Sequence, residues 1–429
     1  MKKFLAIMTL AAVSAAMAVV PGRVGPVSAY GELKAKGGKL VGSCPSYSDK
    51  TVQVKGMSLF WSSAADSALV YYTSQAMGLM VQDMGIEVLR FALGVGDEKF
   101  DSHGRSYTQG GKNDQKAMVT KMVRAAVEND IYIILDWHTE GANGYTSEAK
   151  EFFAWAAEEF GQTNNVIFEI WNEPDGTDMN SVKRHADQVI PVIRQHSDNL
   201  ILVGSPGWSS QPDACANAGI SDNNYGCTLH FYAATHQVGG GYDGAASTAM
   251  GKGVPVFATE WGTVSADGKG SPNRGASEAW INWMNQNGVS WANWSASAIK
   301  EESAAFTSLT LNQGLKYSES GSMVKGWMNK GKSYTDCNLG NHLGSATADD
   351  GFSTGVANGA TTDLIDDMED GDRYTYTGGF WSAWADSDDD TDGRGKTKIS
   401  NKKWTNDFGK ETYDVIVAAK EGNESKYMA

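Results

Sequence analysis

Between residues 51 and 329, short apolar runs alternate with longer segments of helical apolar spacing, and this alternation limits the fold more than any other feature. The short runs, rich in β-branched and aromatic residues, predict eight strands, at 51–55, 86–92, 131–135, 166–171, 200–203, 225–231, 254–259 and 289–294. Helical spacing occurs at 67–84, 114–128, 147–160, 178–195, 273–287 and 320–329. This pattern favours an α/β fold, a (β/α)8 TIM barrel. An open doubly wound sheet is the alternative, but neither GxGxxG nor a P-loop occurs here.

Two of the predicted strands lead directly into a glutamate. The run 166–170 is followed by the Asn-Glu-Pro segment 172–174, which contains Glu173, and the run 254–259 is followed by Glu260. In parallel α/β proteins the chemistry lies at the carboxyl ends of the strands. A single glutamate in this place could be an ordinary loop residue that caps a helix. A pair at one edge is what glycoside hydrolysis needs, because one carboxyl protonates the leaving oxygen and the other attacks the sugar carbon.

Other predicted strands also end in polar or aromatic side chains, at Arg90, Asp136-Trp137-His138, His230-Phe231-Tyr232 and Trp294-Ser295. Any one of these side chains could be a satisfied core residue. Six strands that all end in this way are hard to explain by packing, so we expect a binding site at this edge. Trp61, just after the first strand, offers a further apolar face for the C–H side of a sugar.

These motifs resemble glycoside hydrolase family 5, the cellulase family. The resemblance covers residues 45–337 and rests on segments in the family's order: Leu89-Arg90-Phe91, Asp136-Trp137-His138, Ile170-Trp171-Asn172-Glu173-Pro174, His230-Phe231-Tyr232, Thr259-Glu260-Trp261-Gly262 and Trp291-Ala292-Asn293-Trp294-Ser295. It implies a (β/α)8 barrel and a retaining double displacement, with Glu173 as acid/base and Glu260 as nucleophile. The other positions it matches to the family's site are Arg90, His138, Asn172, His230, Tyr232, Trp294 and Lys300.

The resemblance implies a secreted bacterial endo-β-1,4-glucanase that acts on cellulose or a related β-glucan. Other branches of the family cut mannan or mixed-linkage glucan, and a non-catalytic carbohydrate-binding protein is a further alternative. The chemistry requires no metal or organic cofactor. The net charge of −15 argues against a nucleic-acid partner, and we expect a monomer.

The double displacement sets the protonation state of each glutamate. Glu260 must be ionised to attack the sugar carbon, and we expect Arg90 to hold it in that form. Glu173 must carry a proton when substrate arrives. We therefore expect burial and the neighbouring negative charge to raise the pKa of Glu173.

The first residues have the pattern of a signal peptide. Two lysines precede an apolar run at 4–13, and Ala16-Met17-Ala18 matches a small-x-small cleavage site. We expect residues 1–18 to be removed and the mature protein to be extracellular or periplasmic. The apolar run is too short to span a membrane, and no later segment reaches ~20 unbroken apolar residues. Residues 19–43 lack periodicity and predict a flexible lead-in to a catalytic barrel at 44–337.

The chain contains four cysteines, Cys44, Cys215, Cys227 and Cys337. An even number in an exported chain indicates disulfides, for which three pairings are possible. Barrel closure brings the chain's entry and exit together, and two of the cysteines lie close in sequence. Our hypothesis is that Cys44 pairs with Cys337 and Cys215 with Cys227. No cysteine and histidine spacing predicts a zinc site.

The last part of the chain differs in composition from the barrel. Residues 338–360 are small and polar and predict a linker, whereas 361–429 have turn signals and frequent aromatic residues. We expect a short all-β segment there. Its start, at Leu364–Gly371 and Gly378–Trp381, resembles a β-jelly-roll carbohydrate-binding module. Such modules are longer, so the resemblance predicts an incomplete one.

Overall fold

The computed structural model describes residues 23–337 apart from 65, 97–100, 102–103, 142–144, 309 and 312, together with four short strands between 404 and 428. The chain divides into two units, Met1–Thr361 and Thr362–Ala429. In the second unit the strands form two antiparallel pairs, β11 (Trp404–Thr405) with β12 (Thr412–Tyr413) and β13 (Ile416–Val417) with β14 (Tyr427–Met428). The predicted signal peptide, the linker 338–360 and the motifs that resemble a carbohydrate-binding module lie outside the described residues.

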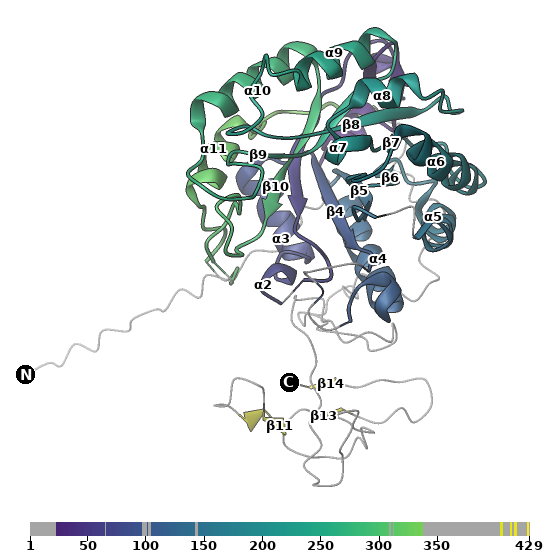
Figure 1. Cartoon of the computed structure of the whole chain (residues 1–429). Helices are drawn as coiled ribbons and strands as arrows, with labels where there is room; N and C mark the ends of the chain where they lie inside the picture. The colour runs from purple at the N-terminus through teal and green to yellow at the C-terminus, as the bar shows by residue number, and fades with distance from the viewer. Residues whose placement is uncertain are drawn as a thin grey trace, which may run out of the picture. The chain divides into compact units, whose positions relative to one another are not determined.

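The first unit is built on a closed barrel of eight parallel strands (Figure 1). In order around the barrel these are β10 (Ser290–Ala296), β3 (Lys55–Leu59), β4 (Val88–Gly94), β5 (Tyr132–His138), β6 (Val166–Glu169), β7 (Ile201–Val203), β8 (Tyr225–Tyr232) and β9 (Val256–Gly262). The ring closes because β10 pairs with both β3 and β9. This architecture confirms the predicted TIM barrel.

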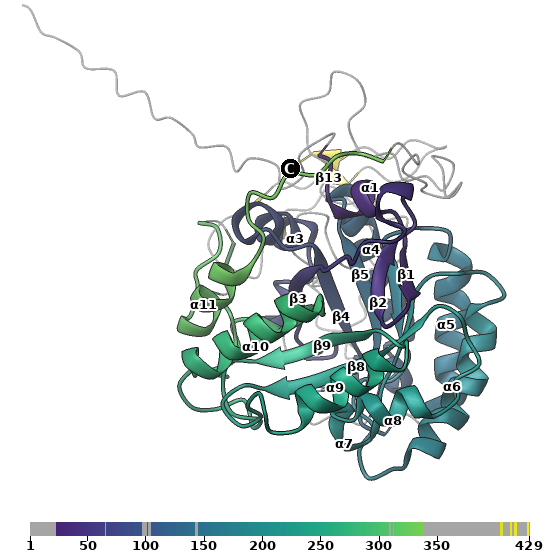
Figure 2. The ribbon, with the colours of Figure 1, turned by 90° about the horizontal axis from the view of Figure 1, so that it is seen from above.

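Helices surround the barrel (Figures 1 and 2). They are α2 (Asp66–Leu69), α3 (Ser74–Leu79), α4 (Lys112–Glu128), α5 (Thr146–Phe160), α6 (Met179–Ile193), α7 (Pro206–Ser209), α8 (Pro212–Asn217), α9 (Tyr242–Gly251), α10 (Arg274–Asn287) and α11 (Glu319–Trp327). On α4 the buried stripe includes Met118, Val119, Met122 and Val123, which belong to the core between helices and strands. This helical spacing is the reason that the sequence predicts α4 well.

The helices of the structure differ from the prediction at 67–84 and at α9. The segment 67–84 is not one helix, because α3 passes into a π-helical turn, η2 (Met80–Met84), that ends at the left-handed Gly85. Helix α9 was not predicted at all. Its buried face consists of Ala246 and Ala249, and such small side chains give a weak periodic signal.

The predicted position of the first strand was wrong. The alternating segment 51–55 precedes β3, and its Val52 and Val54 are buried in a separate apolar cluster at the amino-terminal end of the barrel. The strand itself contains Gly56, where a Cβ atom would lie 1.7 Å from the backbone oxygen of Val88. This close approach requires glycine, which weakens the strand signal in the sequence.

The prediction of a flexible lead-in at 19–43 was also wrong from residue 26 onward. This segment forms α1 (Pro26–Tyr30) and an antiparallel hairpin of β1 (Leu33–Lys36) and β2 (Lys39–Gly42) (Figure 2). Val27, Leu33 and Leu40 are buried in the same apolar cluster as Val52 and Val54. The hairpin turn passes through two left-handed glycines, Gly37 and Gly38, and the strands are too short for the periodicity to be recognised.

Both predicted disulfides are confirmed. Cys44 is bonded to Cys337, 293 residues away, and this bond joins the start of the barrel unit to its end. Cys215 of α8 is bonded to Cys227 of β8, 12 residues away. Among the described residues there is no helix whose length and hydropathy would allow it to cross a membrane.

Candidate active site

The lining of the barrel changes from apolar to charged toward the carboxyl ends of the strands. Residues two apart on a strand share a face. On three neighbouring strands an apolar residue is followed two positions later by a charged one: Val88 by Arg90 on β4, Ile134 by Asp136 on β5 and Ile167 by Glu169 on β6. The charged side chains are buried and therefore must satisfy one another.

Strand β9 has an irregular register where it carries the second glutamate. Two steps on β8, from Thr228 to His230, correspond to three steps on β9, from Phe257 to Glu260. The pairing of β9 with β10 shifts in the same region. Such a β-bulge redirects side chains. Thr259 and Glu260 are adjacent in sequence, yet both make hydrogen bonds to polar groups inside the barrel.

Arg90 is the centre of this charged layer. Its guanidinium lies 2.9 Å from Asp136, 2.7 Å from Glu169 and 3.1 Å from Glu260. It also donates to Oδ1 of Asn172 at 2.7 Å. Burial opposes its charge, but the three carboxylates raise the pKa of Arg90 above its ordinary value. One cation thus links residues from four strands and holds Glu260 in place.

Glu260 accepts hydrogen bonds at both carboxylate oxygens. Arg90 donates to Oε2 at 3.1 Å, and the hydroxyl of Tyr232 donates to Oε1 at 2.9 Å. Burial and the negative charge of Glu173 nevertheless raise the pKa of Glu260 to about 7, against the opposing effects of His230, Arg90 and Tyr232. The motifs led us to expect that Arg90 keeps Glu260 ionised, and they did not predict this rise in the pKa of Glu260.

Glu173 lies opposite Glu260 and contacts a buried histidine. Its Oε1 is 2.8 Å from Nδ1 of His230, and its side chain is 17% exposed. Burial disfavours a charge on His230, but the carboxylates of Glu169, Glu173 and Glu260 raise its pKa to about 9. Ligand atoms of Glu173, His230 and Glu260 all lie within 4.8 Å of one another, so these three could surround a metal ion.

An aromatic wall adjoins these groups. The ring of His138 stacks on Trp294, with centroids 5.3 Å apart, and meets Trp61 edge-on at 4.2 Å. Nδ1 of His138 is 2.6 Å from Oδ2 of Asp136. Burial and the charge of Arg90 lower the pKa of His138 well below its ordinary value, which keeps the imidazole neutral.

The remaining predicted position, Lys300, is exposed in the loop after β10. Among the described contacts, none joins it to the carboxylates. The structure therefore brings together Arg90, His138, Asn172, Glu173, His230, Tyr232, Glu260, Trp294 and Trp61, and places Lys300 outside this cluster.

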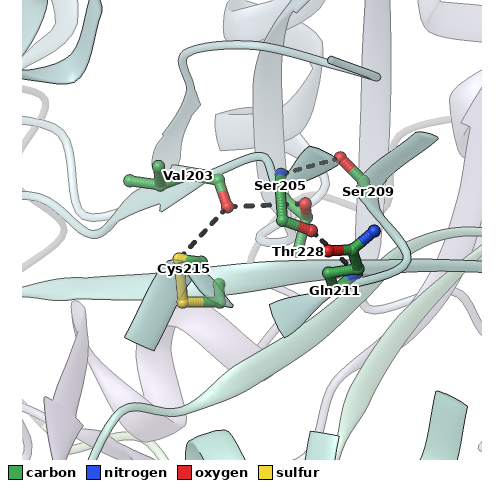
Figure 3. The surroundings of a disulfide bond; sticks show 7 residues. Val203, Ser205, Ser209, Gln211, Cys215 and Thr228 are labelled. Atoms are coloured by element: carbon green, nitrogen blue, oxygen red, sulfur yellow. Dashed lines mark hydrogen bonds between the residues drawn. A yellow bond between two sulfur atoms is a disulfide. The ribbon is translucent and has the colours of Figure 1, made fainter. Parts of the chain in front are cut away.

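The sequence motifs missed a loop that supports the acidic segment at 172–174. Trp208 is 52% exposed, and its backbone N–H donates to the carbonyl of Pro174 at 3.3 Å. The buried Ser209 donates its hydroxyl to the carbonyl of Asn172 at 2.6 Å. Figure 3 shows Ser209 beside Ser205 and Gln211, near the disulfide of Cys215. The sequence feature that could have identified Trp208 as a site residue was its position just after the predicted strand 200–203.

Asp136, Glu169 and Thr259 are also missing from the predicted site. Glu169 was counted as part of an apolar strand, although a carboxylate between Phe168 and Ile170 is costly to bury without partners. Such a charge within a buried run is itself a signal of a buried network. Thr259 gave no comparable signal, because threonine is common in strands.

A (β/α)8 barrel with two carboxylic acids facing each other at the carboxyl ends of its strands defines a glycoside hydrolase. Residues 46–300 match the family model described as Cellulase (glycosyl hydrolase family 5). The chain belongs to this family.

Curated relatives and solved structures agree with this assignment. The chain is 37% identical over 279 residues to Endoglucanase Z of Dickeya dadantii, covering 65% of this chain and 62% of that protein. It is 35% identical to an endoglucanase of Clostridium saccharobutylicum, covering 65% and 60%. The chain thus spans about 60% of the length of these relatives.

Among solved structures, the catalytic domain of endoglucanase Cel5A from Thermobifida fusca is similar with a TM-score of 0.61 and 28% identity, covering 71% of this chain and 99% of that one. A structure from Cytophaga hutchinsonii has a TM-score of 0.63 and 31% identity, covering 71% and 96%.

Proposed function

We propose that this protein is an endo-β-1,4-glucanase that cleaves internal bonds of β-glucan by a retaining double displacement. The observation that supports the mechanism is the short distance between the two glutamates. One carboxylate oxygen of Glu173 lies within 4.8 Å of one carboxylate oxygen of Glu260. Retaining enzymes hold the two carboxyl groups about 5–5.5 Å apart, whereas inverting enzymes need about 6.5–9.5 Å to admit a water molecule. An oxygen of each carboxylate within 4.8 Å of the other supports the retaining class.

Glu260 is the proposed nucleophile. Arg90 and Tyr232 donate to its two oxygens and favour the ionised form, which bonds to the sugar carbon as the leaving group departs. Because Glu260 is 5% exposed, water does not screen these contacts, and they orient the carboxylate before substrate arrives.

Glu173 is the proposed acid/base. It protonates the leaving oxygen in the first step and removes a proton from water in the second. His230 contacts the Oε1 atom and can hold the proton that Glu173 delivers. Arg90 donates to Oδ1 of Asn172, and we propose that the amide N–H of Asn172 donates to the sugar 2-hydroxyl.

Aromatic side chains line the proposed sugar-binding cleft. Trp294 stacks on the His138 ring and Trp61 meets that ring edge-on. Both tryptophans offer apolar faces to the sugar that becomes covalently bound and its neighbours. Trp208 adjoins the loop of Glu173 and offers a face on the leaving-group side. We propose Lys300 as a contact for a more distant sugar hydroxyl.

The names of the relatives, which are endoglucanases, support a glucan as the substrate, and the description of the family as cellulase supports the β-1,4 linkage. The test is a reducing-sugar assay on carboxymethylcellulose, mannan and lichenan, combined with viscosity. We expect release of reducing ends from carboxymethylcellulose with a rapid fall in viscosity, which internal cleavage causes. Faster hydrolysis of mannan would replace the glucanase assignment, and faster hydrolysis of lichenan would indicate a mixed-linkage glucanase. Glu260→Gln should be inactive on all three polymers, and residual activity in that variant would refute the proposed nucleophile.

We also propose that the protein acts outside the cytoplasm after cleavage near Ala18 and that it is a monomer. The basis for export is the pattern of the first 18 residues. Amino-terminal sequencing of protein from the culture medium should give a start just after this site. An intact leader in the mature protein would contradict export by this route.

A further inference from the structure

Behind the two glutamates lies a buried chain of hydrogen bonds that the double displacement does not itself require. Glu169 Oε1 is 2.7 Å from Thr259 Oγ1, which is 2.8 Å from His230 Nε2. On the other side of the imidazole, Nδ1 is 2.8 Å from Glu173 Oε1. Thr259 and Glu169 are fully buried, and His230 is nearly so. The chain runs from the Arg90 layer to the proposed acid/base.

The direction of these hydrogen bonds follows from counting protons. Glu169 faces Arg90 with both oxygens, at 2.7 and 3.3 Å, and this ion pair keeps it a carboxylate that can only accept. The single hydroxyl proton of Thr259 therefore points to Glu169. Oγ1 must then accept from His230, so Nε2 carries a hydrogen in both the neutral and the charged imidazole.

Because Nε2 always carries a hydrogen, His230 and Glu173 share at most one further proton, between Nδ1 and Oε1. With one proton between Nδ1 and Oε1, the pair is satisfied whichever of the two atoms holds it. If that proton is lost, a nitrogen lone pair faces a carboxylate oxygen at 2.8 Å, which is repulsive. The imidazole cannot relieve the repulsion by moving its remaining hydrogen to Nδ1, because Nε2–H is committed to Thr259.

We propose that Thr259, anchored on Glu169, is a positioning residue that fixes the tautomer of His230 and so retains the proton that Glu173 delivers to the leaving group. This inference rests on the proposed role of Glu173. The relay consists of Glu169, Thr259, His230 and Glu173. The bulge in β9 makes it possible, since it turns Thr259 inward beside Glu260.

Other charged groups face His230, and the test must separate them from the relay. They come from four strands or the loops that follow them: Arg90, Asp136, His138, Glu169, Glu173 and Glu260. The carboxylates among them raise the pKa of His230 to about 9, which agrees with a proton retained at neutral pH. Replacing Thr259 leaves all six groups in place and removes only the hydroxyl.

Thr259→Val keeps the shape of the side chain and removes the hydroxyl. The imidazole can then place its hydrogen on Nδ1 once the shared proton is lost, which makes that loss easier. On a cello-oligosaccharide, the alkaline limb of the kcat/KM profile should move about one unit to lower pH. On β-cellobiosyl fluoride, whose leaving group needs no proton, the limb should not move. Thr259→Ser retains the hydroxyl and should restore the wild-type profile.

The matched control is Thr263→Val, since Thr263 is a buried threonine whose hydroxyl contacts Ser320 and not the relay. Its pH profile should match that of the wild type. An unshifted alkaline limb in Thr259→Val, or the same shift in Thr263→Val, would overturn the relay. Glu173→Ala, tested in parallel, should lose activity on the oligosaccharide but retain activity on β-cellobiosyl fluoride. If this variant loses activity on both substrates equally, the proposed role of Glu173 is wrong. That outcome differs from the two outcomes that would overturn the relay.

The wild-type protein provides a test that does not depend on a folded variant. Nitrogen NMR of protein with labelled histidine reports which ring nitrogen carries hydrogen in the neutral form. The relay predicts that His230 has its hydrogen on Nε2 above the pH at which its charge is lost. A neutral ring with hydrogen on Nδ1 would overturn the proposal.

Discussion

Replacing Glu260 with Gln is expected to stabilise the fold at alkaline pH while it removes activity. Folding raises the pKa of this carboxyl from 4.5 to about 7, through burial and repulsion by Glu173. Between these values the folded protein keeps a proton that the unfolded chain releases, so the free energy of unfolding falls as pH rises through this window. The shift corresponds to about 3 kcal/mol when Glu260 is fully ionised.

The substitution removes this loss, because an amide does not ionise. Four carboxyl groups surround the site, Asp136, Glu169, Glu173 and Glu260, against the cations Arg90 and His230. Arg90 therefore keeps the carboxyl groups of Asp136 and Glu169 as partners in the variant and is not left unpaired. The relief of repulsion should outweigh the loss of one ion pair.

Urea unfolding followed by tryptophan fluorescence measures the effect. The quantity to compare is the difference in unfolding free energy between Glu260→Gln and wild type, from about pH 4 to about pH 8. An effect of the amide that is the same at every pH does not contribute to the change of this difference with pH. We expect the variant to gain about 3 kcal/mol over this range. The exposed Glu278 of α10 is the control, and Glu278→Gln should show no such gain. A flat or falling difference for Glu260→Gln would refute the electrostatic reasoning.

Three further results are expected. Tyr232→Phe removes the donor to Glu260 and should move the acidic limb of kcat/KM about 1–2 units to higher pH, with an unchanged limb as the contrary result. Trp208→Ala should raise KM for long cello-oligosaccharides about tenfold through lost stacking but leave β-cellobiosyl fluoride unaffected; equal losses would contradict a leaving-group contact. Replacing Cys44 and Cys337 with Ser should lower the unfolding free energy in urea by about 6 kcal/mol, because this disulfide spans 293 residues. The disulfide that spans 12 residues should contribute only about 3 kcal/mol, and the reverse order would contradict the chain-entropy account.

The sequence predicted the barrel because its strands and helices have strong periodic signals. The apolar runs before Glu173 and Glu260 are short but continuous, as expected for parallel strands that are buried on both faces. The carboxyl-end rule then placed both glutamates at one edge. Predictions failed where local signals were weak or misleading, as at Gly56 of β3, in the hairpin 33–42 and in the alanine-rich α9.

Parts of the candidate site lay beyond pattern reasoning. A β-bulge leaves no mark in the alternation of β9, so the inward direction of Thr259 required coordinates. Glu169 and Asp136 interact with Arg90 across strands, and their importance depends on register. Protonation also depends on three-dimensional neighbours: the motifs led us to expect an ionised nucleophile, whereas burial and the charge of Glu173 raise the pKa of Glu260 to about 7.

The central claim is that Glu173 transfers protons and Glu260 forms the covalent bond, and azide rescue tests it most directly. With an aryl cellobioside that has a good leaving group, Glu173→Ala should form the glycosyl-enzyme rapidly, and azide should then release it by attack from the face opposite the enzyme bond. Proton NMR should identify a β-glycosyl azide, the product of two inversions. Glu260→Ala should give only the α-azide, by direct attack. An α-azide from Glu173→Ala, or a β-azide from Glu260→Ala, would contradict the assignment.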